Sequence, residues 1–282
     1  MANSFATLFE HLSTSTFVER YLHQLPIAVA HGAEHVKQLG TLEVLDAIVL
    51  QPEVNVERSR HGEWWPEEAR PTREELHASL GDGWTIFLRH AERYYAPLGE
   101  LAEEFQRAFQ APIDVQFFCT PAATEGFGWH YDVEDVFILQ THGSKTYRLR
   151  KNTVNPWPLV ETTPDDLSYE AERSLAMECR LNAGDWLYIP PGYWHAAQAE
   201  ELSLSLSVGI LSTTAIDLLE LLRPMLVESL RWRQRLPLTG ELSGLSDAEA
   251  RERLGAVFAD LGRDLASQLP SEEFFERYFD LK

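Results

Sequence analysis

The sequence predicts a mainly β protein with flanking helices, in which an antiparallel barrel or sandwich is followed by a C-terminal helical bundle. Short runs of β-favouring residues, separated by Gly, Pro and Asn, fill the middle of the chain between residues 113 and 211. Segments before and after this region carry apolar residues at steps of three and four, as helices do. Because 44% of the 282 residues are apolar, the chain can bury a sizeable core and is expected to be globular.

Residues 1–110 are expected to form an α/β lead-in that packs on the barrel. The first residues are amphipathic, and Pro71 opens one helix, because proline is tolerated at the start of a helix. In chain order, the expected elements are a strand at residues 26–30, helices at 41–50 and 72–80, a strand at 84–90 and a helix at 92–110.

Residues 111–212 are expected to form the β core. The strands are expected at residues 113–119, 135–140, 145–150, 185–190 and 202–211. Short strands at this spacing, with turn residues between them, favour an antiparallel barrel or sandwich.

Residues 213–282 are expected to form a helical bundle, with helices at 215–235, 247–268 and 272–279. The stretch LLELLRPMLVESLRWRQRL is apolar along one side, more so than a solvent-facing appendage tolerates. Its proline, Pro224, indicates a kink or a break between two shorter helices. A homodimer through this region is expected, and the alternative is that the apolar side packs on the chain's own barrel.

The net charge is −20, and the acidic residues are spread along the chain. Such a surface repels phosphate backbones, so no nucleic-acid partner is expected. It would steer cationic partners toward the protein, and the alternative is that the charge serves solubility alone.

The apolar runs are short and interrupted by charges, and the N-terminal MANSFATLFEHLS has no basic flank before an apolar stretch. Neither a membrane span nor a signal peptide is expected, which implies a cytoplasmic protein. The two cysteines, Cys119 and Cys179, form no CxxC or Cys/His zinc motif and are expected to be reduced thiols without a role.

Two histidine motifs in the β region indicate a metal site. In GFGWHYD, His130 and Asp132 are separated by one residue, so on a strand they share a face and Tyr131 points away. In GDWLYIPPGYWH, His195 follows a turn that can return it to the same end of the barrel. Two histidines and one carboxylate are the ligands of the iron(II) facial triad, which leaves coordination positions open. The HxD motif alone would equally fit a histidine that is satisfied within the core.

With both motifs in place, the sequence resembles the JmjC and cupin-like iron(II)- and 2-oxoglutarate-dependent oxygenases. The segment HYDVEDVFILQTHGSKTYRLR is similar to the ribosomal oxygenase branch, and the likeness spans about residues 117–209. The resemblance implies a double-stranded β-helix, the cupin or jelly-roll barrel, for the core. The helical tail is similar to the dimerisation region of that branch. The winged-helix domain in which its members usually end is expected to be missing.

The resemblance also assigns roles to individual residues. His130, Asp132 and His195 match the iron ligands, and so the catalytic centre. Lys145 matches the basic residue that binds the distal carboxylate of 2-oxoglutarate. The physical reason is that a dicarboxylate inside an apolar barrel needs a cation beside it, and a solvated lysine is the alternative.

The run SLSLS at residues 203–207 places serines on one face of a strand and leucines on the other. The serine face is expected to look into the barrel. Ser205 and Ser207 are therefore candidates for hydrogen bonds to the cosubstrate, unless small residues are there only to leave room. Thr120, at the end of the preceding strand, is a third candidate.

The resemblance implies a dioxygenase that uses Fe(II), 2-oxoglutarate and O2 to hydroxylate a C–H bond, with succinate as the coproduct. The first hypothesis for the substrate is an amino-acid side chain of a protein or peptide, and the second is a small molecule of secondary metabolism. The third hypothesis is a non-catalytic, cupin-like binding module. The complete triad and Lys145 argue against it, because such a module needs neither open coordination positions nor a buried cation.

Carboxylates around the expected mouth of the barrel indicate a basic substrate. Glu125 precedes the glycine turn, and Glu134 shares a face with His130 and Asp132 by parity. Asp135 follows and would either brace the scaffold or touch the substrate. Together with the net charge, Glu125 and Glu134 favour a basic peptide or protein segment, with arginine, lysine or histidine as the oxidised residue.

Overall fold

The structure, a computed structural model, describes residues 4–10, 12–51, 53–65, 71–162, 173–237 and 244–280. The chain divides into two compact units, Met1–Ser212 and Thr213–Lys282, and each is described by itself. The first unit contains both histidine motifs, and the second contains the C-terminal helices.

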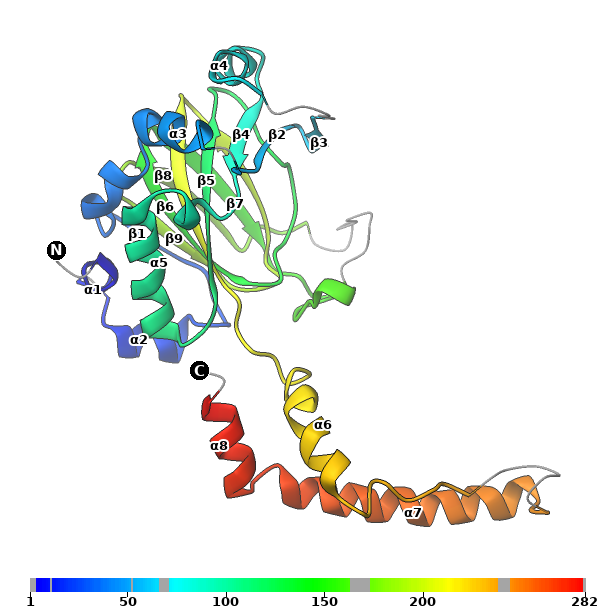
Figure 1. Ribbon diagram of the computed structural model, residues 1–282. Coiled ribbons are helices and arrows are strands. Elements are labelled where there is room, and N and C mark those ends of the chain that lie inside the picture. Colours follow the sequence, from blue (N-terminus) through cyan, green and yellow to red (C-terminus); the bar gives the residue numbers. More distant parts are fainter. Residues whose placement is uncertain are drawn as a thin grey trace. The chain divides into compact units, whose positions relative to one another are not determined.

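Two antiparallel sheets form the first unit (Figure 1). The large sheet has the strand order β1-β9-β6-β11-β5-β4-β2-β3, and the small sheet has the order β10-β7-β8. Every strand pairing among the described residues is antiparallel. The predicted mainly β jelly roll is therefore confirmed, with the difference that its described strands form two separate sheets and do not close into one barrel.

The strands are β1 (Ile27–Val29), β2 (Val56–Arg60), β3 (Glu63–Trp64), β4 (Thr85–Leu88), β5 (Ile113–Thr120), β6 (Asp135–His142), β7 (Ser144–Arg150), β8 (Met177–Asn182), β9 (Trp186–Ile189), β10 (Trp194–Ala199) and β11 (Ser203–Ile210). The helices of the first unit are α1 (Ser4–Leu8), α2 (Thr14–Arg20), α3 (Leu42–Val49), α4 (Arg73–Gly81) and α5 (Ala96–Phe109), with the 3₁₀ turns η1 (Glu34–Leu39), η2 (Ala91–Arg93) and η3 (Val160–Thr162). Strands β1 to β4 belong to the lead-in region, and they extend the two ends of the large sheet.

Local composition does not predict the strands β2, β3 and β8. Three of the five residues of β2 are charged, which is typical of a loop. The strand forms because it pairs with β4 on one side and β3 on the other, and because Arg58 is buried with its guanidinium 4.0 Å from the ring centre of Trp65. Pairing with neighbours from elsewhere in the chain therefore decides this segment.

The helix expected at residues 92–110 is divided into the short turn η2 and the longer helix α5. Pro97 lies in the first turn of α5. A proline further inside a helix would remove a backbone hydrogen bond and clash with the preceding turn, so α5 cannot extend a full turn upstream of it. The buried side of α5 carries Leu98, Leu101 and Phe105.

Alternate side chains of β6 face opposite sides of the large sheet. Phe137 and Leu139 join the outer core, in which Phe137 packs 5.4 Å from Phe105 between ring centres. Val136 and Ile138 join a smaller core with residues of the small sheet. The helices therefore cover the outer face of the large sheet (Figure 1), and the inner face remains available for a cavity.

The second unit contains α6 (Leu218–Glu228), α7 (Asp247–Gln268) and α8 (Glu272–Asp280). Leu222, Met225 and Phe274 form its small buried core, and the indole of Trp232 donates a hydrogen bond of 2.8 Å to Asp264. The helix expected at residues 215–235 is shorter in the structure and ends at Glu228.

Of the kink or break predicted at Pro224, the break is wrong, because α6 continues through this residue for a further turn. A proline at the seventh position of a helix removes one backbone hydrogen bond. Burial of Leu222 and Met225 on either side of Pro224 offsets this cost.

Among the described helices of both units, none is long and apolar enough to cross a membrane.

Candidate active site

Backbone hydrogen bonds bring the two histidine motifs together. The amide of His130 donates to the carbonyl of His195 at 3.0 Å, and the amide of His195 donates to the carbonyl of His130 at 2.7 Å. His130 and His195 form a single antiparallel bridge, because the residues before and after His130 do not pair with β10. Gly126 and Gly128, both with positive φ, make the preceding turn possible.

Asp132 does not lie on a strand, which differs from the expectation of a regular HxD strand. Residues 131 and 132 follow the isolated pair in an irregular segment, and the Asp132 carbonyl accepts a hydrogen bond of 2.8 Å from the amide of Gly192. Gly192 has a φ of +78° in the turn before His195. The second motif therefore fixes the carboxylate of the first through its backbone, while Tyr131 points away and packs on Trp194.

Both histidines bind a backbone carbonyl through Nδ1, which leaves the Nε2 atom available as a ligand. The Nδ1 atom of His130 lies 3.0 Å from the carbonyl of Gly128, and the Nδ1 atom of His195 lies 3.0 Å from the carbonyl of Tyr193. Since a carbonyl only accepts, each Nδ1 carries the proton and each Nε2 keeps its lone pair. An imidazole held in this way is ready to bind a metal through Nε2.

The free atoms of the triad converge. One ligand atom each from His130, Asp132 and His195 lies within 4.8 Å of the others, and His195 Nε2 is 3.5 Å from an Asp132 carboxylate oxygen. Burial, followed by the neighbouring His130, lowers the pKa of His195 well below its usual range, and Asp132 opposes this effect. His195 is therefore neutral at pH 7, as metal ligation requires, and the donor set fits a divalent transition metal.

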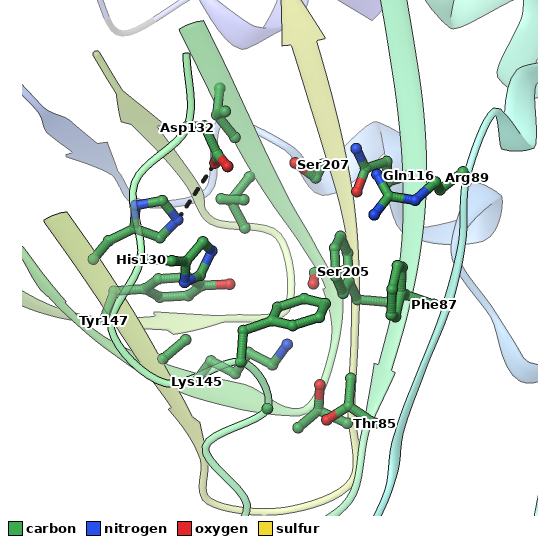
Figure 2. Close-up of a pocket in the computed structure, with 18 of the residues that line it drawn as sticks. Thr85, Phe87, Arg89, Gln116, His130, Asp132, Lys145, Tyr147, Ser205 and Ser207 are labelled. Carbon is green, nitrogen blue, oxygen red and sulfur yellow. Dashed lines mark ion pairs between the residues drawn. The ribbon is translucent and has the colours of Figure 1, made fainter. Parts of the chain in front are cut away.

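The triad opens into a cavity of about 370 Å³ between the two sheets. Every site residue expected from the sequence lines it: His130, Asp132, His195, Lys145, Ser205, Ser207, Thr120, Glu125 and Glu134. Figure 2 shows His130 and Asp132 at one side of the cavity and Lys145 at one end, with Gln116 and Arg89 toward the other end. The structure thus brings the whole expected set together around one space.

Lys145 is buried at 5% exposure and projects from β7 into the cavity. Within the part of the chain that the structure describes, its ammonium has no ion pair or hydrogen bond, and the ring of Phe118 lies 5.8 Å away. Burial lowers the pKa of Lys145 to about 8, so the side chain remains mostly protonated at pH 7. A buried cation without a partner is a natural site for an anion.

The alternation of β11 is as expected. Ser205 and Ser207 line the cavity, whereas Leu204 and Leu206 belong to the outer core. Tyr147 was missing from the expected set, although it also lines the cavity. Because Tyr147 follows Lys145 by two residues on β7, the same parity argument would have found it.

The three acidic residues near the first motif differ in their environment. Glu125 is exposed at the edge of the cavity. Glu134 is partly buried, and its carboxylate lies against Gly209, where a Cβ would come within 2.5 Å of Oε1. Burial, and then the nearby Asp132 and Asp114, raise the pKa of Glu134 to about 7.

Asp135 braces the scaffold. Its fully buried carboxylate accepts hydrogen bonds from the hydroxyl groups of Tyr188 and Ser212 and pairs with His23 at 2.9 Å. Asp135 does not line the cavity. Of the two roles considered for Asp135, the contacts favour the structural one.

A second cluster of possible ligands consists of His90, Glu92 and Asp114. Its carboxylates already accept backbone hydrogen bonds, Glu92 from the amide of Val115 at 3.0 Å and Asp114 from the amide of His90 at 3.2 Å. These carboxylates order the start of β5. The triad is the better metal site because all three of its residues line the cavity, whereas only Asp114 of the second cluster does.

A jelly-roll core with a two-histidine, one-carboxylate triad facing an internal cavity defines a class of metal-binding proteins. Residues 92–218 match the family model described as JmjC domain. The chain is 24% identical over 269 residues to the bifunctional lysine-specific demethylase and histidyl-hydroxylase NO66 of Drosophila mojavensis, which covers 88% of this chain and 30% of that protein. The protein of the same name from Dictyostelium discoideum is 32% identical over 116 residues, or 41% of this chain and 23% of that one.

Solved structures of the ribosomal oxygenase YcfD from Escherichia coli have the same fold. The complex of YcfD with cobalt and 2-oxoglutarate has a TM-score of 0.65 at 20% identity, and covers 95% of this chain and 70% of that chain. Another X-ray structure of YcfD has a TM-score of 0.66 at 21% identity, with the same coverage. Together with the family match, this likeness confirms the resemblance to JmjC proteins of the ribosomal oxygenase type. The chain spans less than a third of the length of the NO66 relatives above.

Proposed function

We propose that this protein is an Fe(II)- and 2-oxoglutarate-dependent dioxygenase that hydroxylates an amino-acid side chain of a protein or peptide. The observation that carries the proposal is the convergence of three metal-ligand atoms, within 4.8 Å of one another, at a cavity that also contains a buried lysine without an ion pair or hydrogen bond among the described residues. The names of the relatives agree, since NO66 is described as a histidyl-hydroxylase and demethylase, and YcfD as a ribosomal oxygenase solved with 2-oxoglutarate.

In this proposal, His130, Asp132 and His195 hold the iron. When bound, iron(II) and 2-oxoglutarate supply the oxidising chemistry, in which O2 provides one oxygen atom to the product and one to succinate, with loss of CO2. The hydrogen bonds from both Nδ1 atoms fix the imidazole rings, so that the Nε2 atoms need no rearrangement on metal binding.

The cavity wall opposite the triad binds the cosubstrate and excludes water. Lys145 meets the distal carboxylate, and the hydroxyl groups of Ser205, Ser207 and Thr120 supply hydrogen bonds. Phe87 and Phe118 stack at 5.6 Å between ring centres on the same wall. An apolar wall of this kind keeps water away from a site where reactive chemistry occurs.

We further propose that the substrate is basic. Glu134 supports this, because its carboxylate faces the cavity without a hydrogen bond or ion pair in the described part of the chain. Gly209 lies in regular strand conformation, and its missing side chain leaves the space in which the Glu134 carboxylate rests. Glu125 and the net charge of −20 add to the attraction of a cation.

Above pH 8, where a Glu134 with a pKa of about 7 is ionised, replacing it with glutamine is expected to raise the KM for a basic peptide substrate about tenfold, because a contact between opposite charges becomes a neutral one, at a cost on the order of 1.4 kcal/mol. Glutamine has the same size, so the space over Gly209 stays filled. Steady-state kinetics at low and high salt measure the effect, which should shrink as salt screens the charges.

Glu178→Gln is the matched control for this change, because Glu178 is half exposed on β8, pairs with Arg148 and does not line the cavity. It removes the same charge and should leave the KM unchanged. If Glu134→Gln raises the KM for neutral peptides as much as for basic ones, Glu134 does not distinguish substrates by their charge, and the proposed basic specificity is wrong.

A small-molecule substrate is the second candidate, favoured by one observation. A cavity of about 370 Å³ is of the size that usually accommodates a small ligand. Incubating the enzyme with a library of basic and neutral peptides, and with small molecules, separates the two functions by mass spectrometry. A gain of one oxygen atom on a peptide supports the proposed function. Oxidation confined to neutral or acidic small molecules would favour the alternative.

The second unit is proposed to form a homodimer. Several large apolar side chains of this unit are exposed, among them Leu219, Val227, Leu230 and Phe258. Exposed apolar residues in this number mark an interaction surface. Light scattering at micromolar concentration is expected to give twice the mass of the 32.2 kDa chain, and Leu230→Glu together with Val227→Glu should halve it. A monomeric mass for the wild-type protein would refute the dimer.

A cytoplasmic location is proposed as well, with no role for nucleic acid or membranes. Its support is that Cys119 and Cys179 are both free, as is usual in a reducing compartment. Burial raises the pKa of the Cys119 thiol to about 12, which makes this thiol unreactive.

A further inference from the structure

Two buried polar groups without partners lie at the same end of the cavity. Within the described ranges of the chain, the hydroxyl of Thr85 has no hydrogen-bond partner; it is inaccessible to solvent, and Thr85 as a whole is 1% exposed. The ammonium of Lys145 also lacks a partner among the described residues. Figure 2 shows both side chains at the end of the cavity away from Asp132 and Arg89.

Thr85 reaches the cavity because of its position on β4. Its backbone is paired in the sheet opposite Ser59, and alternation along β4 turns Thr85 and Phe87 toward the cavity, whereas Ile86 and Leu88 join the outer core. The backbone pairing would be the same for valine, which has nearly the same shape. A buried hydroxyl without a partner destabilises the fold, so the protein carries a cost that valine would avoid.

The glycine turn at residue 126 packs beside the hydroxyl of Thr85. Gly126 also lines the cavity, and a Cβ at this position would lie 3.4 Å from the Thr85 oxygen. The φ of Gly126 is +63°, and its carbonyl accepts a hydrogen bond of 3.1 Å from the amide of Gly62. A side chain at position 126 would therefore fill the space next to the Thr85 hydroxyl, which the glycine leaves unfilled.

We propose that Thr85 is a further binding residue for 2-oxoglutarate, and that its hydroxyl donates a hydrogen bond to the same distal carboxylate that Lys145 binds. This inference rests on the proposed function. A buried carboxylate needs several donors, and a single ammonium on a flexible chain does not fix its orientation, whereas a hydroxyl on a rigid strand does. Thr85 lies outside residues 92–218, the part of the chain that matches the JmjC domain.

The test compares Thr85→Val, which removes the hydroxyl, with Thr85→Ser, which keeps it. Affinity for 2-oxoglutarate is measured by calorimetry without oxygen, in the presence of manganese(II). Thr85→Val should weaken binding at least about tenfold, since hydrogen bonds to charged groups are among the stronger ones, and Thr85→Ser should change it less than about threefold. For 2-oxobutyrate, which lacks the distal carboxylate, neither variant should change the affinity.

Thermal unfolding without ligand separates a ligand-binding role from a structural one. Thr85→Val should unfold at the same temperature as the wild-type protein or higher, because it removes an unpaired buried hydroxyl. Thr85→Ala, which also lacks the hydroxyl, serves as the second variant if the valine protein does not fold. A clear loss of stability in Thr85→Val, with both acids weakened equally, would assign a structural role and overturn the proposal.

The remaining outcomes distinguish this inference from the proposed function. If wild type and Thr85→Val bind 2-oxoglutarate equally well, Thr85 is not a binding residue, and the proposed function is unaffected. If the wild-type protein with manganese(II) does not bind 2-oxoglutarate, both the proposed function and this inference are overturned.

Discussion

Replacing His130, Asp132 or His195 with alanine is expected to abolish iron-dependent turnover of 2-oxoglutarate, with a loss of roughly a hundredfold or more in each case. Changes to groups that merely support metal ligands already reduce affinity or activity by about 10–100-fold, and removal of a ligand itself costs more. The fold should persist, because the pairing of the two motifs uses backbone groups of His130 and His195 that alanine keeps. Succinate formation measures the loss, and thermal unfolding checks the fold.

His142→Ala is the matched control for the triad, since His142 lies exposed at the end of β6 and away from the cavity. Its activity should equal that of the wild-type protein. Full activity in any one of the three triad variants would show that the residue concerned is not a metal ligand.

Replacing Lys145 with alanine is expected to raise the 2-oxoglutarate concentration needed for half-maximal activity by about one and a half to three and a half decades. Leaving a buried charge without its partner typically costs about 2–5 kcal/mol, and about 1.4 kcal/mol corresponds to one decade. The size of the effect follows from the burial of Lys145 and from the absence of any other pairing for it in the described chain. Saturating 2-oxoglutarate should restore much of the activity.

Lys151→Ala removes the same charge from an exposed position just after β7 and should leave the 2-oxoglutarate requirement unchanged. An unchanged requirement in Lys145→Ala would exclude this residue from the cosubstrate site.

Side-chain parity explains why so much of the site could be predicted. On β11, the strict alternation of serine and leucine places Ser205 and Ser207 in the cavity, because one face of the strand must join the outer core. The residues that cap helices can also be recognised from the local sequence. Thr72 and Ser246 start α4 and α7 as capping boxes with glutamates three residues on, so these helices begin within a residue of where the sequence places them.

Features that depend on distant partners could not be predicted. Thr85 and Lys145 come from strands 60 residues apart, and nothing local to either indicates that both face the same end of a cavity. The irregular backbone at Asp132 depends on Gly192 in the same way. For β2, pairing with β4 overrides a composition that favours a loop.

The proposed chemistry is tested most directly by following succinate formation from 2-oxoglutarate with the wild-type protein and with His195→Ala. The proposed iron(II)-dependent oxygenase predicts that the wild-type protein forms succinate only when Fe(II) and O2 are both present, and that a basic peptide increases the rate. His195→Ala should form none under the same conditions. Absence of succinate with the wild-type protein in the presence of iron, oxygen and peptide, or equal formation by both proteins, would contradict the account.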